Sequence, residues 1–205
     1  MNNKVELLGY YGGDKEHAMS AWTSTTRDYE KKKERMPQLL KMLAEHGHET
    51  PFEKSGLHFL VDTEIASHIH ILKHRIGVSV NGESARYKEI REDKFFVPKD
   101  WPLEWKELLI RYNKEGNEAY HKCIEELTPV LGRKRAKESA RFFKTYSSQI
   151  SADIMFNFRS FVHFQRLRNS EHAQIEIREI ADEMLYLVKN IKGNPFNHTL
   201  EAFGL

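Results

Sequence analysis

The sequence of 205 residues predicts a single α+β domain over residues 1–205, helix-rich with a small antiparallel sheet. The length suits one domain that is large enough to bury a core. A hydrophobic content of 40% and a charged content of 30% are typical of a folded, soluble protein. Apolar residues recur at helical spacing in several segments, whereas the alternation typical of strands is found in few.

The elements follow from these patterns in chain order. Gly12 and Gly13 indicate only a local turn, and residues 36–47 are predicted as a helix that Gly47 ends as a C-cap. Residues 55–64 alternate apolar and polar side chains, which indicates a strand with one buried face. Helical spacing predicts further helices at 64–74, 97–127 (with Pro102 near its start), 133–147, 152–168 and 171–192.

Several functional classes are disfavoured by composition. A formal net charge of +2 is no signature of polyanion binding, and no apolar run approaches the ~20 residues of a membrane helix. The N-terminus does not resemble a secretory signal, and the single Cys123 fits a reducing compartment. We therefore expect a cytoplasmic protein that contacts neither membrane nor nucleic acid.

Residues 48–54, HETPFEK, read as a helix start. Thr50 as the N-cap, Pro51 at the first position and Glu53 at the third form a capping box. The same helix start is also suited to receive an anionic ligand. His48, directly before it, has no structural role in the pattern.

His70 and His74 are four residues apart, so a helix would place them on one face. This spacing suits a metal, but there is no third ligand in the pattern and no HExxH motif. We predict no metal site and favour a solvated or ligand-facing histidine pair.

Residues 73–87, KHRIGVSVNGESARY, carry far more hydrogen-bonding groups than a core needs. If the stretch is extended, Ser84 and Arg86 point the same way, and a hydroxyl beside a guanidinium suits a phosphate. The alternative is a polar loop with incidental charge. A nucleophilic Ser84 would need an adjacent base.

Residues 155–177 interleave arginines with phenylalanines, and Arg141 precedes two further phenylalanines. This pattern is typical of an aromatic core helix with a basic edge, and equally of surfaces that stack bases and bind phosphates. Neither a GxGxxG nor a GxxxxGK[ST] motif is present. The residues alone thus indicate a ligand that is phosphorylated and planar.

Three blocks resemble the flavin-dependent thymidylate synthase family. Its signature is an R-H-R triplet, then seven residues and S-x-R-Y, which Lys73-His74-Arg75 and Ser84-Ala85-Arg86-Tyr87 resemble. HGHETPFE at 46–53 is similar to the family's flavin-contacting segment, and residues 157–177 to its C-terminal block.

The resemblance implies the fold type of that family. It also implies a homotetramer with active sites at subunit interfaces. It implies reductive methylation of dUMP to dTMP, with methylenetetrahydrofolate as carbon donor and NADPH reducing through FAD. Two alternatives remain: a related flavoenzyme that modifies another pyrimidine nucleotide or adds a hydroxymethyl group, and a non-enzymatic nucleic-acid-binding module.

The resemblance also assigns roles by position. The flavin contacts it implies are Ser24, Thr50, Glu53, His74, Arg75, Ile76, Asn157, Arg159 and His163, the last where the family usually has Asn. The dUMP contacts it implies are His70, Lys73, Glu83, Ser84, Ala85, Arg86, Arg141 and Arg168. The catalytic residues it implies are His48, beside the flavin ring, and Arg168, at the uracil edge. A permanently charged Arg168 would stabilise negative charge on the ring and favour reaction at C5.

The sequence departs from the family pattern around the nucleotide. Lys73 replaces the first Arg of the triplet, and eight residues rather than seven separate Arg75 from Ser84. The extra residue is expected near Gly77. Gly82 stands where the family's N-E-x-S pattern has its Glu, and the neighbouring Glu83 is expected to take the role of that acid. A divergent synthase is favoured over an altered substrate or an inactive flavin-binding relative.

Overall fold

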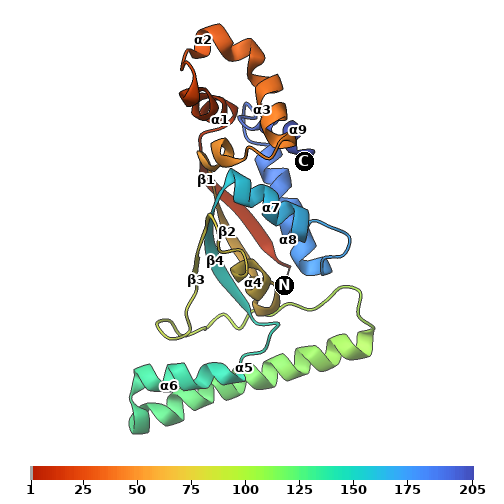
Figure 1. Ribbon diagram of the computed structural model, residues 1–205. Coiled ribbons are helices and arrows are strands. Elements are labelled where there is room, and N and C mark those ends of the chain that lie inside the picture. The colour runs from red at the N-terminus through yellow and green to blue at the C-terminus, as the bar shows by residue number, and fades with distance from the viewer. Residues whose placement is uncertain (1) are drawn as a thin grey trace. The chain divides into compact units, whose positions relative to one another are not determined.

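The computed structural model describes residues 2–205 (Figure 1). Its strands are β1 (Lys4–Tyr11), β2 (Gly56–Glu64), β3 (Val78–Gly82) and β4 (Gln149–Asn157). Its α-helices are α1 (Asp14–Ala21), α2 (Tyr29–Lys32), α3 (Met36–Glu45), α4 (Ile65–Leu72), α5 (Leu103–Leu131), α6 (Arg133–Ala140), α7 (Phe158–Arg168), α8 (Ile175–Lys189) and α9 (Asn197–Phe203). Short 3₁₀ helices cover Trp22–Ser24, Lys33–Arg35, Thr50–Glu53 and Arg141–Phe143.

The strands form one sheet in the order β1-β2-β4-β3. Between β3 and β4, the Asn157 N–H donates to the Gly77 carbonyl at 2.9 Å and the Glu83 N–H to the Ser151 carbonyl at 2.8 Å. Residue numbers rise along one strand as they fall along the other, so this pair is antiparallel. The predicted small antiparallel sheet in a helix-rich α+β fold is confirmed.

The contacts divide the chain into two compact units, each made of several chain segments. Among residues 2–205, the first unit comprises residues 2–4, 61–71 and 81–152, and the second comprises residues 5–60, 72–80 and 153–205. That the chain acts as one domain stays a prediction.

In the first unit, α6 packs along α5 around buried Tyr120, Ile124 and Ala140 (Figure 1). Lys144 bridges α5 and the segment before it, because its Nζ lies 2.9 Å from Asp93 Oδ1 and 4.3 Å from the centre of the Tyr120 ring. The segment that precedes α5 is thereby attached to α5.

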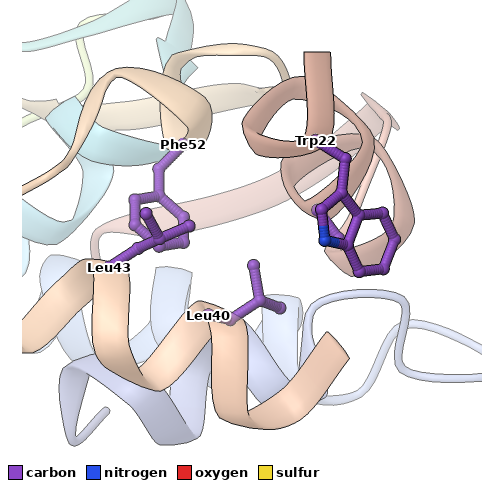
Figure 2. Packing of buried hydrophobic residues seen from close by; sticks show 5 residues of the cluster. Trp22, Leu40, Leu43 and Phe52 are labelled. Atoms are coloured by element: carbon purple, nitrogen blue, oxygen red, sulfur yellow. The ribbon is translucent and has the colours of Figure 1, made fainter. Parts of the chain in front are cut away.

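In the second unit, α3 closes a core over α1 and the Thr50–Glu53 turn. Figure 2 shows Leu40 and Leu43 of α3 in one apolar cluster with Trp22 and Phe52. The helix ends as expected: the N–H of Gly47 donates to the Ala44 carbonyl and the N–H of His48 to the Leu43 carbonyl. Those two bonds form a Schellman motif, for which Gly47, at φ +69°, is the suitable residue.

The prediction of a strand at 55–64 is confirmed, since Leu57, Phe59 and Val61 are fully buried. The prediction of a helix over 152–168 is wrong at its start, because residues 149–157 form β4 and the helix begins only at Phe158. Pairing with β2 and β3 decides this segment, and local sequence does not contain that information. Strand β1 and helices α1 and α9 were missed.

Candidate functional site

The second unit contains a pocket of about 260 Å³ beside α7. Six of the predicted site residues line it: Lys73, His74, Arg75, Ile76, His163 and Arg168. The remaining lining residues are Val78, Ser160 and Leu167. Because lysine and arginine side chains surround a space of this size, the pocket suits an anionic ligand.

The chain at Ile76 and Gly77 is held against the N-terminus of α7. Asn157 caps this helix, accepting from the Ser160 N–H at 2.8 Å, while Ser160 Oγ donates to the Ile76 carbonyl at 2.6 Å. Gly77 has φ +64°, and a Cβ there would lie 2.2 Å from Asn157 Nδ2. Only glycine fits this position. The contact of Ile76 and Gly77 with the start of α7, called the Gly77 clamp here, therefore sets the path of the Lys73–Ile76 segment.

Within the pocket, Arg168 Nε donates to His74 Nε2 at 3.0 Å. Since arginine only donates, His74 must leave Nε2 unprotonated and carry its proton on Nδ1. Burial, assisted by the charge of Arg168 and by His163, lowers the pKa of His74 to about 4. A neutral imidazole thus holds a charged guanidinium whose Nη groups are not used in this bond.

Arg159, at the start of α7, lies between two acids. Its Nε is 2.8 Å from Glu49 Oε2 and its Nη1 is 2.6 Å from Glu53 Oε1. These bonds raise the pKa of Arg159 and link α7 to the Thr50–Glu53 turn. The predicted flavin residues Glu53 and Arg159 are thus in direct contact.

The predicted capping box is wrong. Thr50–Glu53 is a 3₁₀ turn with Glu49 at its N-cap and no side-chain cap bond, because Glu53 turns to Arg159 instead. Thr50 and His48 are exposed, as is Ser24, whose Oγ donates to the Ala21 carbonyl.

The first unit carries the remaining predicted nucleotide contacts, most of them in residues 83–88, called the motif loop here. The N–H groups of Tyr87 and Lys88 donate to the Ser84 carbonyl at 3.1 and 3.0 Å. The loop, with Ala85 inside it, is therefore a turn. The condition under which Ser84 and Arg86 would point the same way, an extended chain, is not met, because β3 ends at Gly82.

Helix α6 contacts the motif loop through charged side chains. Glu138 lies 3.3 Å from Arg86 Nε, and Lys137 donates to the Tyr87 carbonyl at 2.8 Å. Arg141, in the 3₁₀ turn after α6, is exposed. The first unit thus brings together the loop with Ser84 and Arg86 and the helix that leads to Arg141.

Two histidines of α4 have no partner for one ring nitrogen. Nδ1 of His70 and Nδ1 of His68 are buried without a hydrogen bond among residues 2–205. The predicted shared helix face of His70 and His74 is wrong, because α4 ends at Leu72 and His74 lies beyond it.

Sequence reasoning missed Glu49, Glu138 and His68. Glu49 and Glu138 had no signal, because each is defined by a partner distant in the chain. His68 has no signal in the sequence beyond its place two residues before His70. Within the described part of the chain, no three His, Cys, Asp or Glu side chains are grouped to hold a metal. No helix of residues 2–205 is long and apolar enough to cross a membrane.

The fold and the pocket define a class: a helix-rich α+β protein with an antiparallel sheet and a pocket lined by cationic side chains. The family model described as "Thymidylate synthase complementing protein" matches residues 6–192. The flavin-dependent thymidylate synthase of Pseudothermotoga lettingae is 30% identical over 191 residues, covering 91% of this chain and 85% of the relative. That of Thermosipho africanus is 33% identical over 185 residues, covering 83% and 77%.

Among solved structures, a UMP/dUMP methylase, PolB from Streptomyces cacaoi bound with 5-Br dUMP, superposes with a TM-score of 0.80 at 25% identity. It covers 99% of this chain, and this chain covers 95% of it. The chain belongs to the flavin-dependent thymidylate synthase family, and it is a methyltransferase enzyme of that type.

Proposed function

We propose that this enzyme converts dUMP to dTMP by reductive methylation, with methylenetetrahydrofolate as carbon donor and NADPH as reductant through FAD. The observation that carries the proposal is the pair of Arg168 and neutral His74 in a pocket lined by the motif residues. It is supported by the family membership of the chain.

The residues of the second unit fit a flavin with a pyrophosphate group. Arg75 supplies permanent positive charge, and Asn157 and His163 offer polar atoms beside the N-terminus of α7. Arg159 is proposed as a further contact, although it is bound to Glu49 and Glu53. Ser24, Thr50, Glu53 and Ile76 are proposed as further contacts. When bound, FAD would supply the redox chemistry, which protein side chains cannot perform.

Most of the proposed nucleotide contacts lie in the first unit. Ser84 and Arg86 would bind the phosphate through charge-assisted hydrogen bonds, with Arg141 as a further cation. His70, Lys73, Glu83 and Ala85 complete the proposed set, although the carboxylate of Glu83 is bound to Lys88 at 2.8 Å.

Arg168 is the proposed catalytic cation. C5 of uracil is a weak nucleophile, and a guanidinium at the N3/O4 edge stabilises the negative charge that makes this carbon reactive. His74 contributes by accepting from Nε, which orients the Nη groups. His48 is proposed to act where folate meets the flavin ring.

We also propose a homotetramer with active sites at subunit interfaces, working in the cytoplasm. The free Cys123 is compatible with a reducing compartment. Light scattering of the purified enzyme measures the oligomeric state, and a monomeric active enzyme would refute the tetramer.

An absorbance spectrum of the FAD-reconstituted protein tests the reaction. Anaerobic NADPH should bleach the flavin band, more rapidly with dUMP present, and addition of methylenetetrahydrofolate should then yield dTMP. A protein that binds no FAD, or that reduces it without forming dTMP, would refute the proposal.

A second candidate is methylation of UMP, which the departures Lys73 and Gly82 and the similarity to a UMP/dUMP methylase favour. The same assay with UMP in place of dUMP should form 5-methyl-UMP at a comparable rate if this candidate is correct. Turnover of dUMP alone would exclude it.

A further inference from the structure

His68 is a buried group that the proposed mechanism does not use. It lies on α4, two residues before His70, and only 8% of its surface is exposed. Its Nδ1 is enclosed and has no hydrogen bond among residues 2–205. Buried polar groups are usually paired, so an imidazole whose Nδ1 has no protein partner is unusual, and Nε2 is the ring nitrogen that a ligand can reach.

The ring of His68 reaches the last residue of β3, Gly82, directly before the motif loop. A Cβ on Gly82 would lie 3.2 Å from both Cε1 and Nε2 of His68. The backbone of Gly82 does not need glycine, since its φ is not in the left-handed region. Glycine is therefore present for space and not for its backbone conformation, because a side chain at 82 would press against the imidazole.

The carboxylate of Glu83, next to the position where the family motif has its acid, already has partners in the protein. Its Oε1 lies 2.8 Å from Lys88 Nζ and its Oε2 accepts from the Ser151 N–H at 3.4 Å. The carboxylate is thus bound to groups on the sheet side, in a pocket lined by Lys4 and Gln149 among others. His68 is the side chain that reaches the exposed end of β3.

The chemistry of His68 is that of an uncharged donor. Burial lowers the pKa of its imidazole, so the ring is neutral at pH 7. An enclosed N–H without an acceptor is less tolerable than an enclosed acceptor, which favours the proton on Nε2. Nε2 faces Gly82, which is exposed and open to a ligand.

We propose that His68, in the space left by Gly82, is a specificity-determining residue that donates from Nε2 to an oxygen of the base or sugar of the bound pyrimidine nucleotide. The inference rests on the proposed function, because it takes a pyrimidine nucleoside monophosphate as the ligand. It places an uncharged donor where the family motif has a carboxylate.

Calorimetric titration of the FAD-loaded enzyme with dUMP tests the proposal. H68A should weaken dUMP binding about tenfold, the factor for one net hydrogen bond. H68Q retains a side-chain N–H donor and should recover most of that loss. G82A, which pushes against the ring, should weaken binding severalfold, whereas G9A, whose Cβ meets nothing within 4 Å, should not.

His58, on β2 and paired with Asp153, provides the matched histidine control, and H58A should bind dUMP like the wild type. Dissociation constants for H68A within twofold of the wild type, or for H68Q as weak as for H68A, would overturn the inference. If H68A does not fold, H68Q and G82A decide. A wild-type enzyme that binds no dUMP refutes the proposed function as well, whereas normal turnover with unaffected His68 variants refutes this inference alone.

Discussion

At the scale of single residues, the contact between His74 and Arg168 requires a neutral histidine and orients the guanidinium. The hydrogen bond at 3.0 Å requires a neutral acceptor, and burial beside the guanidinium keeps His74 neutral. Arg168 in turn loses freedom at Nε and presents its other nitrogens in a fixed orientation. Lysine cannot replace it, because an ammonium group lacks the planar fork.

We therefore expect Arg168→Lys to lower kcat/KM for dUMP by about 100-fold, the range for removal of one charge-stabilising donor. Steady-state dTMP formation measures the effect, with the melting temperature as a check of folding. The matched control is Arg166→Lys on the same helix, an exposed residue whose guanidinium lies 5.5 Å from the Phe203 ring. Retention of more than half of the activity by Arg168→Lys would contradict the assigned role.

At the scale of elements, the N-terminus of α7 organises the site of the second unit. Its cap residue Asn157 and its first-turn Ser160 bind the chain at Ile76 and Gly77, and Arg159 binds the Thr50–Glu53 turn. Two motif segments that are distant in the sequence are thereby fixed to one helix end. The placement of the Ile76–Gly77 segment depends on how closely the backbone of Gly77 approaches Asn157 and Ser160.

Gly77→Ala should destabilise the protein by about 2–4 kcal/mol, because a left-handed backbone and a steric clash with Asn157 and Ser160 act together. Gly47→Ala is the control, since Gly47 has a similar φ of +69° but no atom within 4 Å of a Cβ. It should cost only about 1 kcal/mol. Urea unfolding measures the free energy of unfolding of both variants. Equal losses would show that the Gly77 clamp contributes nothing to stability.

At the scale of the whole chain, a buried network joins residues near both ends. His17 is fully buried, with Nδ1 2.9 Å from Thr199 Oγ1 and Nε2 2.7 Å from Ser55 Oγ. Asp14 accepts from the Thr199 N–H and hydroxyl at 2.8 and 2.5 Å. Helices α1 and α9 are therefore connected through polar groups that are all paired.

This network predicts a pH-dependent stability. Burial lowers the pKa of His17 to about 3, far below the ordinary value of about 6.5, so the unfolded state binds more protons between these values. The contribution of neutral His17 to the free energy of unfolding is complete above pH 6.5. It is lost as pH falls toward 3, by about 1.4 kcal/mol per pH unit. Burial raises the pKa of Asp14, which acts in the opposite sense.

Urea unfolding between pH 4 and 7 should show a free energy of unfolding that declines in acid. His17→Asn should be less stable at pH 7 but should decline less steeply, by about one proton. The exposed His46 offers a control, and His46→Gln should keep the wild-type slope. An unchanged slope in His17→Asn would assign the acid sensitivity elsewhere.

Local patterns predicted those elements whose burial is regular along the chain. Leu57, Phe59 and Val61 alternate on β2, and α3 ends at Gly47 as expected, because periodicity and capping act over a few residues. The sequence pattern predicts a helix over β4, because Phe156 and Phe158 continue the aromatic pattern of α7 and mask the alternation before them. Strand β1 alternates between exposed and half-buried residues and has no buried one, so it offers no comparable signal.

The sequence by itself determined the family, the helix-rich α+β class and the residues of the three motif blocks, since these depend on residue identity and spacing. Only the tertiary structure revealed that Arg168 rests on a neutral His74, that Glu49 shares Arg159 with Glu53, and that His68 reaches Gly82. Each of these is a contact between residues separated by at least fourteen positions. Packing decides such contacts. Residue spacing carries information only about near neighbours in the chain, so it does not report on them.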